Sequence, residues 1–182
     1  MSKIFGIGAH RTGTLSLATA LRRLGILTSH WQHHEELTKA YLTGDYELSF
    51  LTEYEAVVDL PVPIMFRELD QHYPGSKFIL TDRAVESWLR SVERYLNGRR
   101  LVYEEYLLHG AWQYDASLSR VRFEQHRDDV ITYFESRPED LLILSVVEGE
   151  GYEKLCPYLG LEPPNEPFPD VNKGQDQRYA VT

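Results

Sequence analysis

Two hydrophobic patterns alternate along this chain of 182 residues. Short apolar runs predict buried β-strands, and longer segments with apolar residues three or four positions apart predict amphipathic helices. Strands are predicted at residues 3–8, 26–31, 55–59, 77–81 and 141–147. The last of these runs is apolar enough for a strand that is buried on both faces.

Helical spacing follows each of the first four strands. Helices are predicted at residues 14–24, 33–42, 46–52, 64–73, 84–95, 115–135 and 148–159, and an extended, proline-stiffened segment at 163–169. Alternation of strand and helix predicts a three-layer α/β/α fold with a mainly parallel five-stranded sheet. We expect a single domain over residues 1–182, with the first strand at the centre of the sheet.

The first strand leads into a turn bounded by two glycines, Gly8 and Gly13. Thr14 then opens a helix, so that successive N–H groups and the positive end of the helix dipole point at one spot. This arrangement predicts a phosphate or sulfate site, with Arg11 as a cation inside the turn. An ordinary glycine turn between a strand and a helix is the alternative.

Composition limits the partners. The formal net charge of −9 argues against a nucleic-acid binder or a protein of anionic membranes, so an anionic ligand needs a local cluster of Arg and Lys. Cys156 is the only cysteine, which excludes an intramolecular disulfide. No apolar run is long enough to span a bilayer, and the N-terminus enters the first strand directly. We expect a soluble cytoplasmic protein without a membrane partner.

Polar residues at strand ends are further candidates. Asp59 ends the third strand, and ligands of open α/β sheets bind at such ends. Arg83 leaves the fourth strand, and Ser91 follows eight positions later on the next helix. A solvated Arg and Ser on an ordinary amphipathic helix are the alternative. His30 and His34 are four positions apart, but His30 lies in the predicted strand, so His30, His33 and His34 give no helical i, i+4 pair. They also lack a nearby cysteine, so no metal site is predicted.

The segment from Arg11 to Leu17, with the sequence Arg-Thr-Gly-Thr-Leu-Ser-Leu, resembles the loop of sulfotransferases that use 3′-phosphoadenosine 5′-phosphosulfate (PAPS). It is most similar to the bacterial and fungal branch with Arg in place of Lys. His10 replaces the usual Pro, and Leu15 replaces a hydroxyl residue. The resemblance extends over Arg83, Trp88 and Ser91 to the run from Glu148 to Lys173, and so covers Ile4 to Lys173.

This resemblance implies the fold of the P-loop nucleoside triphosphate hydrolases, with strand order 2-3-1-4-5. It also implies PAPS as sulfuryl donor and 3′,5′-adenosine bisphosphate (PAP) as product. Arg83 and Ser91 would hold the 3′-phosphate. The residues expected to hold the 5′ side are Arg11, Thr12, Gly13, Thr14 and Ser16.

The resemblance also suggests catalytic roles. In cytosolic sulfotransferases a His-x-Pro segment removes the acceptor proton, and Asp59-Leu60-Pro61 takes that place here. Asp59 is therefore the predicted base, unless it only caps the following turn. Arg11 would stabilise charge on the leaving oxygen. His30 falls where the family often has a His near the acceptor.

Two other functions stay open. One is a Mg²⁺-dependent P-loop nucleotide phosphotransferase or hydrolase with Asp59 on the metal, although the Lys expected after Gly13 is missing. The other is a non-catalytic nucleotide-binding relative.

The acceptor is an unidentified small molecule with a hydroxyl or amine. Aromatic residues between 95 and 114 would line a pocket for an aromatic or apolar acceptor, or pack between helices. The sequence leaves the oligomeric state open.

Overall fold

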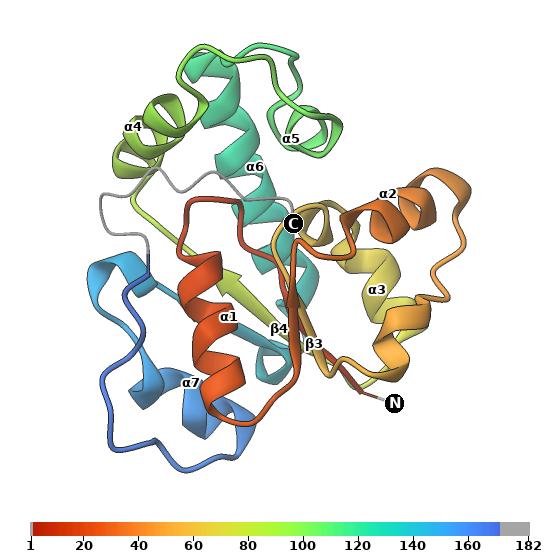
Figure 1. Ribbon diagram of the computed structural model, residues 1–182, viewed down its shortest axis with the longest axis vertical. Helices are drawn as coiled ribbons and strands as arrows, with labels where there is room; N and C mark the ends of the chain where they lie inside the picture. Colours follow the sequence, from red (N-terminus) through yellow and green to blue (C-terminus); the bar gives the residue numbers. More distant parts are fainter. Residues whose placement is uncertain (1, 172–182) are drawn as a thin grey trace.

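A five-stranded parallel sheet organises the protein (Figure 1). The structure is a computed structural model that describes residues 2–171. The strand order is β2-β3-β1-β4-β5, with β1 at the centre, as predicted. Phe5 of β1 pairs with Val57 of β3 on one side and with Phe78 of β4 on the other. The strands are β1 (Ile4–Gly6), β2 (Thr28–His30), β3 (Ala56–Val58), β4 (Lys77–Thr81) and β5 (Leu141–Leu144).

Helices cover both faces of the sheet, which confirms the α/β class. The α-helices are α1 (Thr14–Arg23), α2 (His34–Thr43), α3 (Phe66–His72), α4 (Val85–Leu96), α5 (Tyr103–His109), α6 (Ala116–Phe134) and α7 (Tyr152–Leu159). Figure 1 shows α1 and α7 together on one side, where Leu21 and Leu155 share a buried cluster with Ile79 of the sheet. Leu69 of α3 and Phe134 of α6 belong to a second cluster, with Phe5 and Phe78 of the sheet.

A third apolar cluster lies beyond the sheet and joins α4, α5 and α6. Trp88 and Val92 of α4 pack there with Leu108 of α5 and Phe123 of α6. Trp88 is only 1% exposed, and its ring stacks on Phe123 with centroids 4.2 Å apart. This helical layer stands above the end of β4 in Figure 1 and supports the loop described below. No helix within residues 2–171 is long and apolar enough to cross a membrane.

Several predicted elements are shorter than expected. Residues 46–52 form only a 3₁₀ turn, η1 (Ser49–Thr52), and the predicted helix at 64–73 divides into η2 (Val62–Met65) and α3. A third 3₁₀ turn, η3 (Pro138–Asp140), precedes β5. The predicted helix from Glu148 begins instead at Tyr152, after η4 (Val146–Glu148), because Gly149 takes a left-handed φ of 101°. Asn172 and Lys173, at the end of the predicted resemblance, lie outside the described residues.

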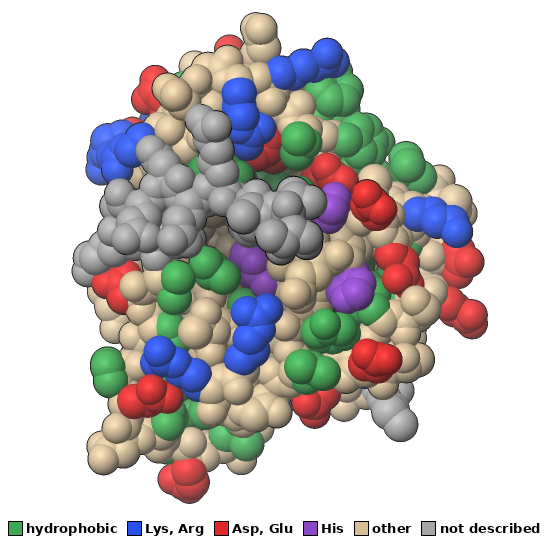
Figure 2. Space-filling model, in the orientation of Figure 1, with side chains coloured by type: hydrophobic (Ala, Val, Ile, Leu, Met, Phe, Trp, Pro, Cys, Tyr) green, Lys and Arg blue, Asp and Glu red, His purple; other side chains and the backbone are tan. Residues whose placement is uncertain are grey.

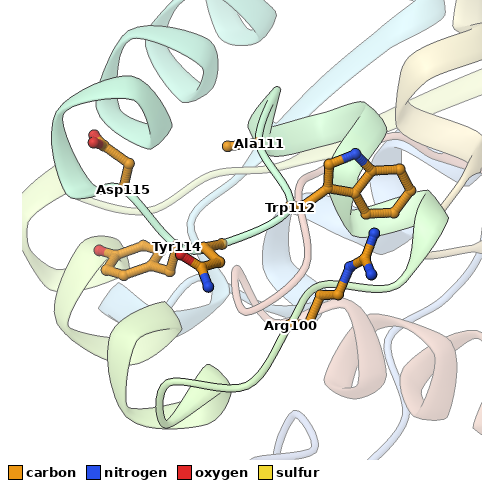
Figure 3. Close-up of a pocket in the computed structure, with 6 residues that line it drawn as sticks. Arg100, Ala111, Trp112, Tyr114 and Asp115 are labelled. Atoms are coloured by element: carbon orange, nitrogen blue, oxygen red, sulfur yellow. The ribbon is translucent and has the colours of Figure 1, made fainter.

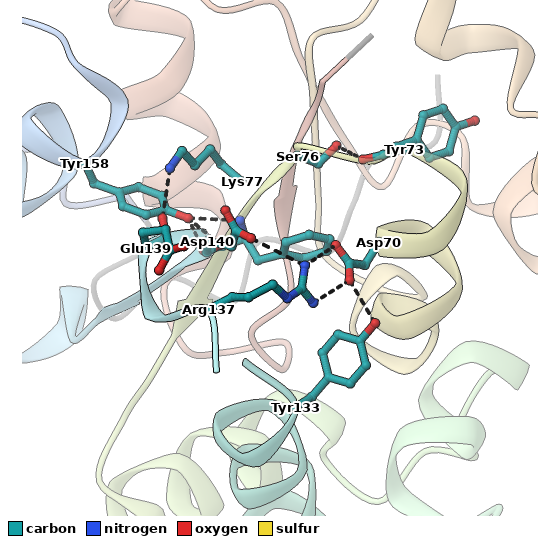
Figure 4. Close-up of polar contacts among 10 residues, drawn as sticks. Asp70, Tyr73, Ser76, Lys77, Tyr133, Arg137, Glu139, Asp140 and Tyr158 are labelled. Carbon is teal, nitrogen blue, oxygen red and sulfur yellow. Dashed lines mark hydrogen bonds and ion pairs between the residues drawn. The ribbon is translucent and has the colours of Figure 1, made fainter. Parts of the chain in front are cut away.

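A polar network holds the edge of the sheet at which the strands begin (Figure 4). The Arg137 guanidinium donates to both carboxylate oxygens of Asp70, at 2.7 and 3.2 Å, and the Tyr133 hydroxyl donates to the same carboxylate at 2.8 Å. The pKa of Asp70 lies below its usual value because the hydrogen bonds from Arg137 and Tyr133 outweigh the effect of burial. The network ties α3 to α6 and to the turn before β5.

Candidate functional site

The loop of residues 8–13 runs from the end of β1 to the start of α1. Gly8 is required by close packing, because a Cβ atom there would lie 1.9 Å from Thr81 Oγ1 and 2.5 Å from the Thr81 carbonyl oxygen. Gly13 takes a φ of 107°, and Arg11 takes a left-handed φ of 67°. No side chain caps the first turn of α1 from the Gly13 position. The loop thus has the strand–turn–helix form that the sequence predicts for an anion site.

Thr12 holds the loop in shape. Its hydroxyl donates to the Ala9 carbonyl oxygen at 2.6 Å and lies 2.6 Å from the Thr81 hydroxyl of β4. The side chain is fully buried, so these contacts fix the loop against the central part of the sheet. Thr12 therefore faces inward, and its predicted contribution to nucleotide binding stays a prediction.

The structure brings Arg11, Arg83 and Ser91 together. The Arg11 Nε donates to the Ser91 hydroxyl at 3.2 Å, and Arg83 Nη1 donates to the Arg11 carbonyl oxygen at 2.9 Å. Arg83 Nε also donates to Ser87 of α4 at 3.0 Å. Burial, followed by the positive charge of Arg11, lowers the pKa of Arg83. Two crowded guanidinium groups of this kind favour an anion as their ligand.

His30 and Asp59 lie at the ends of neighbouring strands. Residues His30 and Val58 are partners in the parallel pairing of β2 and β3, so Asp59 comes directly after the paired residue. The His30 Nε2 atom lies 3.2 Å from Asp59 Oδ2 and 3.4 Å from the Thr14 hydroxyl at the start of α1. Both side chains are almost completely buried. The two candidate proton acceptors thus lie beside the first turn of α1.

The protonation state of His30 follows from this burial. Desolvation lowers the pKa of His30 from its usual value of 6.5, and the attraction of Asp59 opposes that shift only in part. His30 is therefore neutral near pH 7. Asp59 has a left-handed φ of 83°, and its Oδ1 accepts a hydrogen bond from the Leu60 N–H at 2.9 Å. A neutral imidazole beside a carboxylate can accept a proton.

Three other predicted or candidate residues have structural partners. The Ser16 hydroxyl accepts a hydrogen bond from the Val171 N–H at 3.1 Å, so its predicted role at the nucleotide also stays a prediction. The His33 ring stacks on Phe50, with centroids 4.3 Å apart. The His34 ring stacks on Trp31 at 4.5 Å. Figure 2 shows histidine side chains near the middle of the face that it presents, between the α1 and α2 regions.

The aromatic segment between residues 95 and 114 packs in part between helices, and its use as an acceptor pocket stays a prediction. Tyr114 packs against the third cluster, and its hydroxyl donates to the Leu89 carbonyl oxygen at 3.2 Å. Trp112 is 41% exposed and stacks on Tyr106 at 4.3 Å, with the Arg100 guanidinium 4.7 Å from its ring centre. A shallow depression of about 590 Å³ adjoins Arg100, Trp112 and Tyr114 (Figure 3).

Sequence reasoning missed one buried polar group beside the loop. His10 contacts His109 of α5, and His109 contacts Ser119 of α6. His10 in place of the family's Pro indicated a departure from the family at this position. Its partner His109 could not be found from the sequence, because it lies 99 residues away and belongs to no motif. Within residues 2–171, no group of three or more His, Cys, Asp or Glu side chains is placed to hold a metal ion.

A parallel α/β sheet with a glycine-bounded loop after its central strand defines a protein of the P-loop class, and two arginines beside the loop suit an anionic ligand. The sequence model of the family described as "Sulfotransferase domain" matches residues 3–122 and 99–177. The chain therefore belongs to the sulfotransferase family.

Part of the chain is also similar to a curated protein. It is the "Ava biosynthesis cluster protein M" of Aspergillus versicolor, which is 33% identical over 112 residues. The match covers 52% of this chain and 43% of that protein. The chain thus matches less than half of the relative's length.

Proposed function

We propose that this protein transfers a sulfuryl group from PAPS to the hydroxyl or amine of a small-molecule acceptor. The observation that carries the proposal is the convergence of Arg11, Arg83 and Ser91 beside the loop of residues 8–13. These residues come from two separate strand–helix units, and the positive charges of Arg11 and Arg83 suit the two anionic ends of an adenosine nucleotide. Membership in the sulfotransferase family supports the same reaction.

Each part of the loop region has a task in this proposal. The backbone N–H groups around Gly13 and Thr14 hold the 5′-phosphosulfate, helped by the dipole of α1. Arg83 and Ser91 hold the 3′-phosphate. Arg11 stabilises the negative charge that develops on the bridging oxygen as its bond to sulfur breaks. PAPS supplies the sulfuryl group, and the protein supplies position and charge.

The pair of Asp59 and His30 accepts the proton that the acceptor group loses. Asp59 takes the proton in the first assignment, because it occupies the place of the histidine in the family's His-x-Pro segment. Its contact with His30, at 3.2 Å, provides a neutral imidazole to share the proton. His30 lies beside Thr14 and Asp59 contacts His30, so the pair is close to the nucleotide end at which we expect the sulfuryl group.

Calorimetric titration with PAP, AMP and ATP·Mg²⁺ tests the proposal. PAP is expected to bind about a hundredfold or more tighter than AMP, because two charge-assisted hydrogen bonds to the 3′-phosphate contribute about 1.5 to 3 kcal/mol each. Arg83→Ala should remove most of this difference. Arg90→Ala is the matched control, because it removes the same charge from an exposed position of α4.

The alternatives predict other results. Equal affinity for PAP and AMP would contradict the assignment of the 3′-phosphate site. Tight binding of ATP only with Mg²⁺ would favour the phosphotransferase. PAP binding without any sulfuryl transfer, tested with a panel of hydroxyl and amine acceptors, would favour a non-catalytic relative.

A further inference from the structure

The group that the sequence did not reveal is a buried chain of three polar side chains. His10 Nε2 lies 2.8 Å from His109 Nε2, and His109 Nδ1 lies 2.9 Å from the Ser119 hydroxyl. The exposed fractions of His10, His109 and Ser119 are 6%, 1% and 1%. These three hydrogen-bonded side chains thus connect the loop of residues 8–13 to α5 and then to α6, through the interior of the helical layer.

His10 is fixed by its main chain as well as by its side chain. The indole Nε1 of Trp88 donates to the His10 carbonyl oxygen at 2.8 Å. The Trp88 ring also stacks on the His109 ring, with centroids 5.6 Å apart and planes 15° apart. The next residue is Arg11, which has a left-handed backbone. A displacement of His10 would therefore move Arg11.

The contact between the two imidazoles depends on how many of the two facing ring nitrogens carry a proton. Two ring nitrogens 2.8 Å apart form a hydrogen bond when one of them carries a proton and the other does not. The Ser119 hydroxyl can donate or accept, so it accommodates either arrangement of neutral tautomers. If both rings are protonated, two N–H groups face each other and the contact is repulsive.

The surroundings disfavour charge on these rings. Burial lowers the pKa of His10 well below 6.5, and the charges of His109, Arg11 and Arg99 lower it further. Burial lowers the pKa of His109 to about 4, although Glu105 of α5 opposes that shift. The groups that face the pair are Arg11 in the loop, Trp88 and Tyr95 of α4, Arg99 after α4, Glu105 of α5, Tyr114, and Ser119 of α6.

We propose that His10 and His109 are positioning residues, whose shared hydrogen bond holds the loop and Arg11 in the geometry that binds the nucleotide, and that protonation of both rings releases it. The inference concerns residues that make no contact with the reacting atoms. It rests on the proposed function only in naming PAP as the ligand. The contact itself can be tested in the free protein.

The first experiment follows the free protein by NMR between pH 3.5 and pH 8, a range that includes the pKa of about 4 of His109. The imidazole nitrogens of His10 and His109 should titrate together and below pH 6.5, and the backbone amides of Arg11, Thr12 and Gly13 should shift over the same range. His109→Gln keeps a polar group near the Nε2 position without a titrating ring, so it should abolish the amide shifts. Loop amides that ignore the imidazole titration would overturn the proposal.

The second experiment measures PAP affinity by calorimetry at pH 7.5 and at pH 4, near the pKa of His109. His109→Asn, which retains a partner for Ser119 but loses the contact with His10, should weaken binding about tenfold at pH 7.5, the scale of one hydrogen bond. At pH 7.5, His109→Gln should bind PAP within about threefold of the unaltered protein, and it should lose less affinity than the unaltered protein at pH 4. The phosphates of PAP titrate equally with both proteins, so the difference between their pH profiles belongs to the pair.

Ser119→Ala separates positioning from general damage to the core. It removes the outer hydrogen bond and should lower the midpoint of thermal unfolding, while PAP affinity changes by less than about threefold. Unchanged PAP affinity and pH profile in His109→Asn would overturn the proposal. Absence of PAP binding by the unaltered protein would instead contradict the proposed function, and the loop amides would then decide the role of the pair.

Discussion

Arg11 contacts two side chains of α4 from inside the loop. Its Nε donates to Ser91 at 3.2 Å, and its guanidinium carbon lies 5.0 Å from the centre of the Tyr95 ring. The Arg99 guanidinium lies 5.2 Å from the same ring centre. Contact with an aromatic face directs the Arg11 side chain along α4 while it keeps its charge. Its position is thus set by α4 as well as by the loop.

Arg11→Ala is expected to lower the rate of sulfuryl transfer more than the affinity for PAP. The cation matters most when charge builds on the leaving oxygen, so the loss in rate should be about a hundredfold or more. Arg11→Lys, which keeps the charge but not the planar fork, should be milder. Single-turnover rates and PAP titrations with the three proteins measure this split. An unchanged rate in Arg11→Ala would leave Arg11 as a binding residue only.

Asp59→Asn should retain the fold and PAP binding and lower transfer by about a hundredfold or more, the scale of a lost general base. Asn tolerates the left-handed backbone of Asp59, so this change removes the charge with little strain. Asp45→Asn, at an exposed position, is the control. Turnover close to normal in Asp59→Asn would move the role to His30, and a parallel loss of Mg²⁺ binding would favour the phosphotransferase.

Single residues were predictable where one element carries the information. Arg83 and Ser91 are eight residues apart in one short segment, and Gly8 and Gly13 bound the loop in the sequence, although the packing that requires Gly8 involves Thr81 of β4. His109 was not predictable, because its partner His10 is distant in the chain and a buried His has no periodic pattern. The Thr12 side chain points inward because its hydroxyl contacts that of Thr81 in β4. This contact joins separate elements, so it was not predictable either.

At the scale of elements, the loop and β4 are held in close contact. Gly8→Ala would place its Cβ against the main chain of Thr81, which cannot move without disturbing β4. We expect a loss of about 2 to 3 kcal/mol in the free energy of unfolding, in the range of overpacked cores. Gly75→Ala is the control, because its φ of 77° causes strain of about 1 kcal/mol but the space around it is open. Urea denaturation measures both; equal losses would contradict the close packing.

The types of most elements were predictable, but the helix α5 (Tyr103–His109) was not predicted, and neither were several element ends. Apolar runs located all five strands, yet β5 ends at Leu144 and three of its four residues are only half-buried, because it lies at the edge of the sheet. The number of neighbours of a strand depends on the topology and not on its own sequence. The late start of α7 depends on the left-handed Gly149, which helical spacing of apolar residues does not reveal.

For the whole molecule, buried histidines predict acid sensitivity. The pKa of His109 is about 4 in the folded protein, whereas an unfolded His titrates near 6.5. The unfolded chain therefore binds the proton first as the pH falls, so this contribution is complete above pH 6.5 and is lost progressively down to about pH 4. His10 and His126, whose pKa values burial also lowers, act in the same direction.

We expect the free energy of unfolding to fall by on the order of 2 kcal/mol between pH 7.5 and pH 5 from His109 alone. Urea denaturation at the two values measures the fall. His109→Gln should make it smaller by that amount, and His72→Gln, at an exposed position of α3, should not. An identical fall in all three proteins would show that other groups dominate.

The network of Asp70, Tyr133 and Arg137 lies at the edge where the strands begin, whereas the loop and the Asp59–His30 pair lie where they end. This stabilising network is therefore spatially separated from the candidate catalytic groups. Graded substitutions such as Tyr133→Phe and Arg137→Lys should give proteins of decreasing stability whose catalytic groups are untouched. Such a series relates the activity of the protein to its free energy of unfolding when the catalytic groups are unchanged. A variant near the loop that is less active than this relation predicts for its stability has altered chemistry as well as weakened folding.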